Sequence, residues 1–323
     1  MQLIQRAYAG EADKQAMAAL VRAYPAGNFH IADLPYRLSS WALDDPQNVG
    51  LWVDSNGRLR AWAVMQTPWW TIDFAFHPDA GPDIHRQILS WADQRAHQLS
   101  SSPGAPSAWF VNVFPGQKER IQALEAAGFA SQADVGEDAW SKVWMGLSRE
   151  PVKVYSPPAG FVVRPLAGAG EVGAYVELHR SVFESKNMTV EWRLRTLTHP
   201  DYVPELDMVV AAPDGRLAAF CIGWLNRRPA SRPSGQIEPL GCYKDFRKYA
   251  LGRVALTACL AQMQACGART IHVETDNYRN TAFALYRSVG FRVVRNVRVF
   301  RKDYETSLFL ISSHQCSSVC ICG

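Results

Sequence analysis

Apolar and polar residues follow two periods that divide the chain into strand-like and helix-like segments. A period of two predicts a half-buried strand, and apolar residues three and four positions apart predict an amphipathic helix. In the first half, strands are expected at 3–8, 50–53, 58–66, 69–76, 107–114 and 139–147, and helices at Glu11–Tyr24, Ile31–Leu43, Asp83–Leu99 and 118–128.

The same order of segments begins again after a break that contains prolines. Arg149–Gly160 holds three prolines and shows neither period, which indicates a linker. Beyond it, strands are expected at 161–166, 206–212, 216–226, 235–242, 270–276 and 291–300, and helices at Glu171–Glu184, Val190–Leu197, Leu251–Cys266 and Asn280–Ser288.

Two local matches indicate that the halves are copies of one unit. The tripeptide at 57–59, Gly-Arg-Leu, recurs 158 residues later at 215–217, and Gly128-Phe129 recurs 162 residues later at 290–291. Similar offsets at distant points favour duplication over coincidence. The mixed order of strands and helices predicts an α/β fold with helices on both faces of each sheet.

These boundaries predict two domains, 1–150 and 160–304, joined by a linker at 151–159 and followed by an irregular tail at 305–323. A chain of 323 residues with 48% hydrophobic and 20% charged residues suits two globular domains. The net charge of +4 suits small anionic ligands and is too mild to indicate nucleic acid. No basic and apolar leader and no membrane-length apolar run are present, so a cytoplasmic protein without a membrane partner is expected.

The cysteines indicate neither disulfides nor a metal site. Four of the seven lie in apolar strand or helix patterns, where a free thiol usually behaves as a small core residue. The other three, Cys316, Cys320 and Cys322, lie near His314 in the tail, but their spacing matches no standard zinc pattern. The tail is therefore interpreted as a frayed terminus, and no metal is expected.

The stretch from Gly235 to Gly252, GQIEPLGCYKDFRKYALG, has the layout of an anion site. A strand runs into a basic loop and then into a helix that is expected to start near Leu251. The first N–H groups of a helix have no partners and carry about half a positive charge, so a phosphate can bind them. Arg247, Lys248 and Arg253 add full positive charges.

The stretch resembles the pyrophosphate loop of the GCN5-related N-acetyltransferases (GNAT), Arg/Gln-x-x-Gly-x-Gly/Ala, which follows the strand that holds the pantetheine arm of acetyl-CoA. Here Ala250 replaces one glycine, and a Cβ hinders backbone angles and close ligand approach that glycine allows. The resemblance implies acetyl-CoA as co-substrate. It also implies a set of cofactor-binding residues: Leu240, Gly241, Cys242, Arg247, Lys248, Tyr249, Ala250, Leu251, Gly252, Arg253 and Asn280.

A second motif strengthens this resemblance. NTAFALYRSVGF, from Asn280 to Phe291, looks like the short GNAT helix with a tyrosine before Gly-Phe. The resemblance implies two tandem GNAT domains, each a mixed and mostly antiparallel sheet that is splayed where cofactor and acceptor meet. Tandem GNAT proteins similar to mycothiol synthase have this layout. Asn280 is expected either to cap the short helix, which is the preferred interpretation, or to touch the cofactor.

Glu238 and Tyr286 are the candidate catalytic residues. Glu238 lies on the strand before the cofactor turn, and we interpret it as a base, direct or through water. The alternative is a structural carboxylate, either in a salt bridge or hydrogen-bonded to the backbone. Tyr286 matches the thiol-protonating tyrosine of the family, against the alternative of a core tyrosine whose hydroxyl has some other partner. Cys242 is not expected to act as a nucleophile, because GNAT chemistry is direct transfer.

The first half lacks this chemistry. DAGPDIHR at 79–86 places acidic residues where phosphate needs positive charge, and Leu124 takes the place of Tyr286. We therefore expect an N-acetyltransferase that acts on a primary amine of a small molecule through its C-terminal domain, with a catalytically silent N-terminal domain. The alternatives are a non-catalytic CoA- or ligand-binding protein and a protein N-acetyltransferase. A monomer or homodimer is expected.

Overall fold

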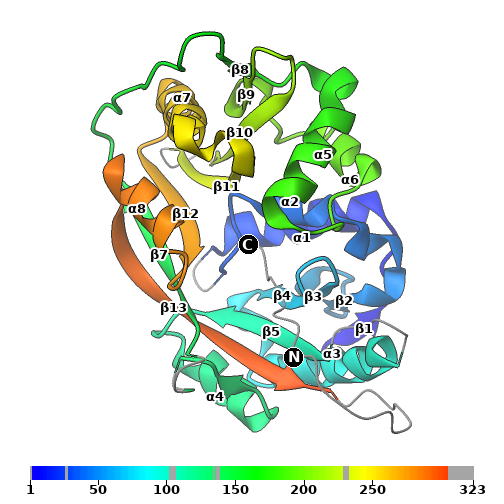
Figure 1. Ribbon diagram of the computed structural model, residues 1–323. Helices are drawn as coiled ribbons and strands as arrows, with labels where there is room; N and C mark the ends of the chain where they lie inside the picture. The colour runs from blue at the N-terminus through cyan, green and yellow to red at the C-terminus, as the bar shows by residue number, and fades with distance from the viewer. Residues whose placement is uncertain are drawn as a thin grey trace, which may run out of the picture. The chain divides into compact units, whose positions relative to one another are not determined.

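The computed structural model describes the chain except residues 1, 26–27, 102–106, 134, 136–138, 228–232 and 305–323 (Figure 1). The predicted cysteine-rich tail lies outside the described residues. Within the described part, no helix is long and apolar enough to cross a membrane, and no cluster of His, Cys, Asp and Glu could hold a metal ion. The described chain forms two compact units, each with its own core.

Unit 1 is a sheet with helices on both faces, built mainly from the N-terminal half. Its described residues lie within 2–31, 40–142 and 296–304. The strand order is β1-β2-β3-β4-β5-β13, antiparallel except for β4 and β5. Its strands are β1 (Ile4–Arg6), β2 (Val49–Val53), β3 (Leu59–Gln66), β4 (Thr71–Phe76), β5 (Ala108–Val113) and β6 (Ala130–Ser131), which pairs with β13 (Arg292–Asp303). Its helices are α1 (Glu11–Ala23), α3 (Ile84–Ser100) and α4 (Lys118–Ala126), with 3-10 turns η1 (Trp41–Asp44), η2 (Pro46–Asn48) and η3 (Pro78–Ala80).

Unit 2 comprises 143–295 together with Ala32–Ser39 from the N-terminal half. Its strand order is β7-β12-β11-β10-β9-β8, again mostly antiparallel. The strands are β7 (Ser141–Leu147), β8 (Val162–Pro165), β9 (Asp207–Ala211), β10 (Leu217–Asn226), β11 (Ser234–Cys242) and β12 (Thr270–Asp276). The helices are α2 (Leu34–Leu38), α5 (Val172–Phe183), α6 (Val190–Leu197), α7 (Leu251–Ala265) and α8 (Asn280–Ser288), with 3-10 turns η5 (Gly168–Glu171), η6 (Pro204–Leu206) and η7 (Lys244–Tyr249).

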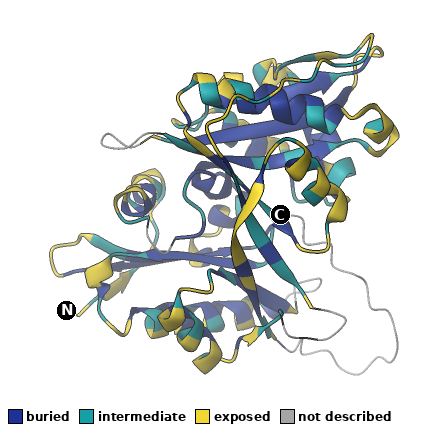
Figure 2. Ribbon diagram, turned by 90° about the vertical axis from the view of Figure 1, so that its left-hand side faces the viewer, coloured by how far each residue is buried: buried dark blue, intermediate teal, exposed yellow. Residues whose placement is uncertain are grey.

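The two faces of the unit 2 sheet bury different residues of β10. Gly223 faces α7, since a Cβ there would lie 2.9 Å from Cys259 Sγ. Phe220 faces α5, with its ring 5.1 Å from that of Tyr175. Figure 2 shows that the strands are largely buried while the exposed residues gather on the outer sides of the helices. The predicted α/β class, a mixed and mostly antiparallel sheet between helices, is confirmed.

The matched turns of the two halves share backbone geometry as well as sequence. Gly57 and Gly215 have φ of +74° and +84°, and Gly128 and Gly290 have φ of +85° and +105°. The residues three positions before Gly57 and Gly215 also make matching hydrogen bonds: Asp54 N donates to Arg58 O at 3.0 Å, and Ala212 N donates to Arg216 O at 2.8 Å. Glycine adopts positive φ without steric cost, which explains why these positions match. The repeated geometry supports duplication.

Three segments depart from the predicted domain boundaries, and the first of them is Ala32–Ser39 in unit 2. The last strand, β13, places its residues from Asn296 onward in unit 1, while β7 places most of its residues in unit 2. The predicted linker packs on α7, where Val152 N donates to Gln264 Oε1 at 3.3 Å and Tyr155 N donates to Thr257 Oγ1 at 3.2 Å. The prolines of the linker keep its backbone out of regular secondary structure. Side chains of α7 accept hydrogen bonds from its backbone N–H groups instead. Each compact unit therefore contains a strand from the other half of the sequence: unit 1 contains most of β13, and unit 2 contains most of β7.

Candidate active site

Strands β11 and β12 run side by side for three residue pairs and then separate. Their parallel pairing joins Ser234, Gly235 and Gln236 to Thr270, Ile271 and His272. Beyond these pairs β11 continues to Cys242 and β12 continues to Asp276 without further pairing between the two. We call this separation the splay. The splay lies between the later residues of β11 and of β12, as the sequence resemblance implied, and α7 follows β11 in the chain.

The start of α7 has the free donors that an anion requires. Arg253 N and Val254 N donate to Ala250 O, at 3.0 and 3.3 Å. The N–H groups of Leu251 and Gly252 have no backbone acceptor among the described residues, and no side chain caps the helix. These two donors and the positive end of the helix face the region after Cys242.

Gly252 leaves space at this helix start. A Cβ on Gly252 would lie 3.7 Å from Leu285 Cδ2 and 3.8 Å from Cys242 Cβ, which are ordinary contacts. Gly241 differs, because a Cβ there would approach the Phe220 ring to 2.6 Å and Val182 Cγ1 to 2.7 Å. Gly241 is thus required by packing, whereas nothing in the protein itself requires a glycine at 252.

Three basic side chains lie around the start of α7, and they differ in how far solvent reaches them. Arg247 and Lys248 are exposed on η7, the 3-10 turn that forms where a loop was expected, and Tyr249 and Ala250 are exposed beside them. Arg253 is half-buried, with its guanidinium 5.2 Å from the Tyr155 ring and with its Nε buried and without a hydrogen-bond partner in the described chain. The donors and charges at this turn fit a diphosphate group.

Cys242 is held as a neutral thiol. Burial raises the pKa of the Cys242 thiol, against the opposing effects of the Gly252 N–H and the positive charge of Arg247. The thiolate is the nucleophilic form of cysteine, so a raised pKa disfavours a nucleophilic role. Leu240 is half-buried on the same side of β11, where alternation also places Glu238 and Cys242.

Glu238 lies at the start of the splay and is fixed through its backbone. Trp224 is 1% exposed and its Nε1 donates to Glu238 O at 2.7 Å. The Glu238 side chain is half-buried, and its negative charge raises the pKa values of Tyr36, Tyr175 and Tyr286 after the larger effect of burial. Glu238 therefore lies within electrostatic reach of three tyrosines.

Tyr286 presents a hydroxyl with no hydrogen-bond partner among the described residues. The side chain is 6% exposed, and its ring lies 5.7 Å from that of Phe291 in an edge contact. Burial, followed by the charge of Glu238, raises the pKa of Tyr286 well above its ordinary value. The phenol is therefore protonated at all ordinary pH values and can donate its proton to a ligand.

Asn280 does not cap α8, and the preferred capping interpretation was wrong. The residue that precedes the helix is Arg279, which makes no side-chain cap, and Asn280 is the first residue of the helix itself. The helix has the predicted bounds, Asn280–Ser288, and Asn280 N donates to Tyr278 O at 2.9 Å in the preceding turn.

The sequence analysis missed Tyr36, which the N-terminal half contributes to unit 2. Tyr36 is 2% exposed on α2, its ring lies 5.1 Å from that of Trp192, and its carbonyl accepts from Trp192 Nε1 at 3.1 Å. Its hydroxyl lies 3.5 Å from His179 Nε2. No local pattern could reveal this, because Tyr36 and Trp192 lie 156 residues apart.

A buried polar cluster lies behind the three tyrosines. Arg193 and Asp207, both fully buried, form an ion pair, and Tyr202 donates to Asp207 Oδ2 at 2.7 Å. The Arg193 guanidinium lies 3.9 Å from the centre of the Tyr175 ring, and the Tyr175 hydroxyl is buried without a partner in the described chain. Tyr175 links this cluster to Glu238, because the charge of Glu238 contributes to raising the pKa of Tyr175.

Comparison with known proteins finds a similarity in unit 2. Residues 174–291, which include β11, α7 and α8, match the family model of the Acetyltransferase (GNAT) family. No curated protein matches the chain by sequence.

Solved structures show that the GNAT fold extends over nearly the whole chain. A GNAT protein from Sphaerobacter thermophilus is 20% identical with a TM-score of 0.61, over 95% of this chain and 98% of that one. A tandem GNAT protein from the clavulanic acid biosynthesis pathway is 15% identical with a TM-score of 0.63, over 95% and 100%. A GNAT acetyltransferase from Colwellia psychrerythraea is 12% identical with a TM-score of 0.54, over 94% and 100%. The tandem GNAT fold is thereby confirmed, and the likeness to mycothiol synthase stays a prediction.

Proposed function

We propose that this GNAT protein transfers the acetyl group of acetyl-CoA to a primary amine of a small molecule at the splay of unit 2. The start of α7 carries the proposal. It offers two N–H groups without backbone acceptors, room above Gly252 and the basic residues Arg247, Lys248 and Arg253 to a diphosphate. Leu240, Gly241 and Cys242 on β11 would hold the pantetheine arm.

Two residues would move the protons of the reaction. Acetyl-CoA supplies a thioester, and its carbonyl carbon gains a bond to the amine nitrogen while its bond to sulfur breaks. Glu238 takes the proton that the amine loses, directly or through a water molecule. Tyr286 gives its phenolic proton to the departing sulfur, a role that suits a hydroxyl with a raised pKa and no protein partner in the described chain.

The corresponding place in unit 1 supports a catalytically silent domain. The α3 start follows Asp79 and Asp83, which expose 83% and 65% of their side chains and would repel a diphosphate. Leu124 stands at the position of Tyr286 and is fully buried, so no hydroxyl is available. We infer that unit 1 does not carry out the transfer.

Cofactor binding is tested with a matched pair of glycine variants. Gly252 and Gly173 are each the second residue of a helix, and neither lacks room for a Cβ. Gly252→Ala should leave stability unchanged or slightly raised but weaken acetyl-CoA binding about tenfold or more, or about 1.4 kcal/mol, since the methyl group obstructs the N–H donors. Gly173→Ala should leave binding unchanged. Isothermal titration calorimetry measures both, and equal affinity in wild type and Gly252→Ala would refute the assignment.

Turnover is tested with Glu238→Gln and Tyr286→Phe. Each should lower kcat/KM by about a hundredfold or more while acetyl-CoA affinity is retained, because a proton-transfer group is lost. Tyr286→Phe should not reduce stability, since the hydroxyl has no hydrogen bond to lose among the described residues. Release of free CoA thiol over a panel of small amines provides the rate.

The same assay separates the alternatives. Binding of acetyl-CoA without turnover on any amine would support a non-catalytic ligand-binding protein. Acetylation of peptides but not of small amines would support a protein N-acetyltransferase.

A further inference from the structure

Unit 1 contains a buried positive charge without a counter-ion. Arg120 on α4 is 6% exposed, and its guanidinium lies 4.3 Å from the centre of the Phe74 ring and 5.5 Å from that of Phe76. Among the described residues it makes neither a hydrogen bond nor an ion pair. Burial alone lowers the pKa of Arg120 to about 10, so the side chain is still charged at neutral pH.

Two other deeply buried arginines are paired with carboxylates. Arg95, 8% exposed, pairs with Asp45 and donates to Asn48 Oδ1 at 2.9 Å. Arg193, fully buried, pairs with Asp207. A buried charge without a counter-ion is costly, and stacking on an aromatic ring offsets only part of that cost. Arg120 therefore lacks the compensation that a buried cation normally has.

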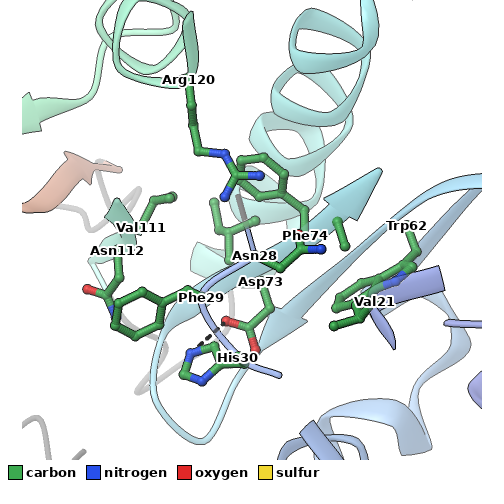
Figure 3. A pocket seen from close by; sticks show the side chains of 12 residues that line it. Val21, Asn28, Phe29, His30, Trp62, Asp73, Phe74, Val111, Asn112 and Arg120 are labelled. Carbon is green, nitrogen blue, oxygen red and sulfur yellow. Dashed lines mark ion pairs between the residues drawn. The ribbon is translucent and has the colours of Figure 1, made fainter. Parts of the chain in front are cut away.

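The Arg120 side chain lines a cavity at the separation of β4 and β5. These strands are parallel neighbours that pair only at Thr71 and Phe110, and the cavity lies beyond that pair. Figure 3 shows the guanidinium reaching from α4 over the ring of Phe74. Stacking covers one face of the guanidinium and leaves its N–H groups in the plane available to a ligand.

Both neutral amides and charged or titratable groups line the cavity. Asn28 and Asn112 contribute amides, and Asn28 Nδ2 already donates to Tyr24 O at 2.7 Å. Asp73 contributes a carboxylate to the cavity lining, and its Oδ1 lies 3.9 Å from Nε2 of His30. Asp73 is not within ion-pair distance of Arg120, so it does not supply the missing counter-ion.

The size of the cavity restricts the ligand. Its volume of about 20 Å³ has room for one or two water-sized groups. A planar carboxylate can bind the edge of a guanidinium with two parallel hydrogen bonds, whereas a diphosphate is too large for this space.

We propose that the cavity between β4 and β5 of unit 1 binds the carboxylate group of a small molecule through Arg120. This site is separate from the proposed acetyl-CoA site, and the proposal does not depend on acetyl transfer. It gives the silent domain a role in ligand binding.

Thermal unfolding of the full-length protein tests the proposal. Sodium formate and sodium acetate should raise Tm in a saturable manner relative to sodium chloride of equal ionic strength. Arg120→Met should abolish that rise, and its Tm without ligand should equal or exceed that of wild type because an unpaired buried charge is removed. The matched control is Arg86→Met on α3, where the arginine is 73% exposed, and it should respond as wild type does.

Arg120→Lys keeps the charge but not the planar pair of donors, so it should weaken carboxylate binding about tenfold. If Arg120→Met does not fold, the Tm response of Arg120→Lys to formate and acetate tests the proposal in its place. The proposal is wrong if wild type shows no carboxylate-specific rise, or if Arg120→Met or Arg120→Lys responds fully. A rise with sodium phosphate but not with formate or acetate would also overturn the carboxylate assignment.

Discussion

At the scale of single residues, His179 is a histidine kept neutral by its surroundings. The side chain is 7% exposed, with its ring 5.8 Å from that of Phe220 and nearly parallel to it. Burial, with the positive charges of Arg193 and Arg180, lowers the pKa of His179 to about 3. His179 is therefore an uncharged core residue of α5 at neutral pH.

This lowered pKa predicts a loss of stability in acid. Between pH 6.5 and 3 the unfolded chain binds a proton at His179 that the folded protein does not bind, so the free energy of unfolding falls as pH falls. From pH 7 to pH 5 the loss due to His179 should be about 2 kcal/mol. Urea unfolding at both pH values measures this loss. The free energy of unfolding of His179→Gln, which lacks the titrating ring, should fall less between pH 7 and pH 5 than that of wild type. An equal loss in both proteins would contradict this explanation.

The sequence revealed the residues whose signals are local. Gly252, Arg253 and Tyr286 stand in motifs that span a few positions, and Glu238 follows from strand alternation. Tyr36 and the pair of Arg193 with Asp207 could not be found in this way, because tertiary packing alone brings Tyr36 to Trp192 and His179. Arg120 was likewise invisible, since an arginine on an amphipathic helix normally faces solvent.

At the scale of elements, the start of α7 depends on a backbone conformation unusual for its residue. Ala250 has φ of +55° and ψ of +27°, the left-handed region, and it both ends η7 and precedes α7. A Cβ makes this region unfavourable by roughly 1 to 2 kcal/mol relative to the right-handed helix, and glycine avoids that cost. The departure from the GNAT loop noted in the sequence thus occurs where glycine would be favoured.

Ala250→Gly should therefore raise the free energy of unfolding by about 0.5 to 1 kcal/mol, the strain relieved less the backbone entropy lost. Ala261→Gly in the middle of α7 is the control, and it should lower stability by about 1 kcal/mol because that residue is in an ordinary helix. Chemical denaturation of both variants measures the difference. A lower stability of Ala250→Gly would show that the left-handed turn carries no strain.

Most elements followed from periodicity, and the exceptions have local causes. The helix expected at Ile31–Leu43 is divided into α2 and η1, because Ser39 Oγ donates to Pro35 O at 2.7 Å where the helix ends. The basic loop after Cys242 is a 3-10 turn. Strand β6 was missed because two residues are too short to show a period.

At the scale of the whole molecule, the exchange of strands makes the two halves interdependent. The strand β13 pairs with β5 from Arg298↔Val113 to Asp303↔Ala108, and Phe300 is fully buried in the unit 1 core. Met145 and Leu147 of β7 are likewise part of the unit 2 core. Duplication was visible in the sequence, but the exchange was not, because a strand pattern does not specify which sheet it joins.

Cutting the chain at residue 150 should therefore give two fragments that do not fold separately. Fragment 1–150 would lack the strand that covers β5 and the ring of Phe300 that fills its core. The same fragment with residues 292–304 joined by a flexible linker should unfold cooperatively when followed by circular dichroism. Cooperative unfolding of 1–150 alone would contradict the interdependence.

The position of β13 also has a consequence during translation. Ribosomes build the chain from its N-terminus, so the residues of β5 emerge long before their hydrogen-bonding neighbour at 298–303 has been made. For most of synthesis the nascent chain carries an open sheet edge that can pair with other polypeptides. Protection by chaperones in this interval would determine the yield of native protein.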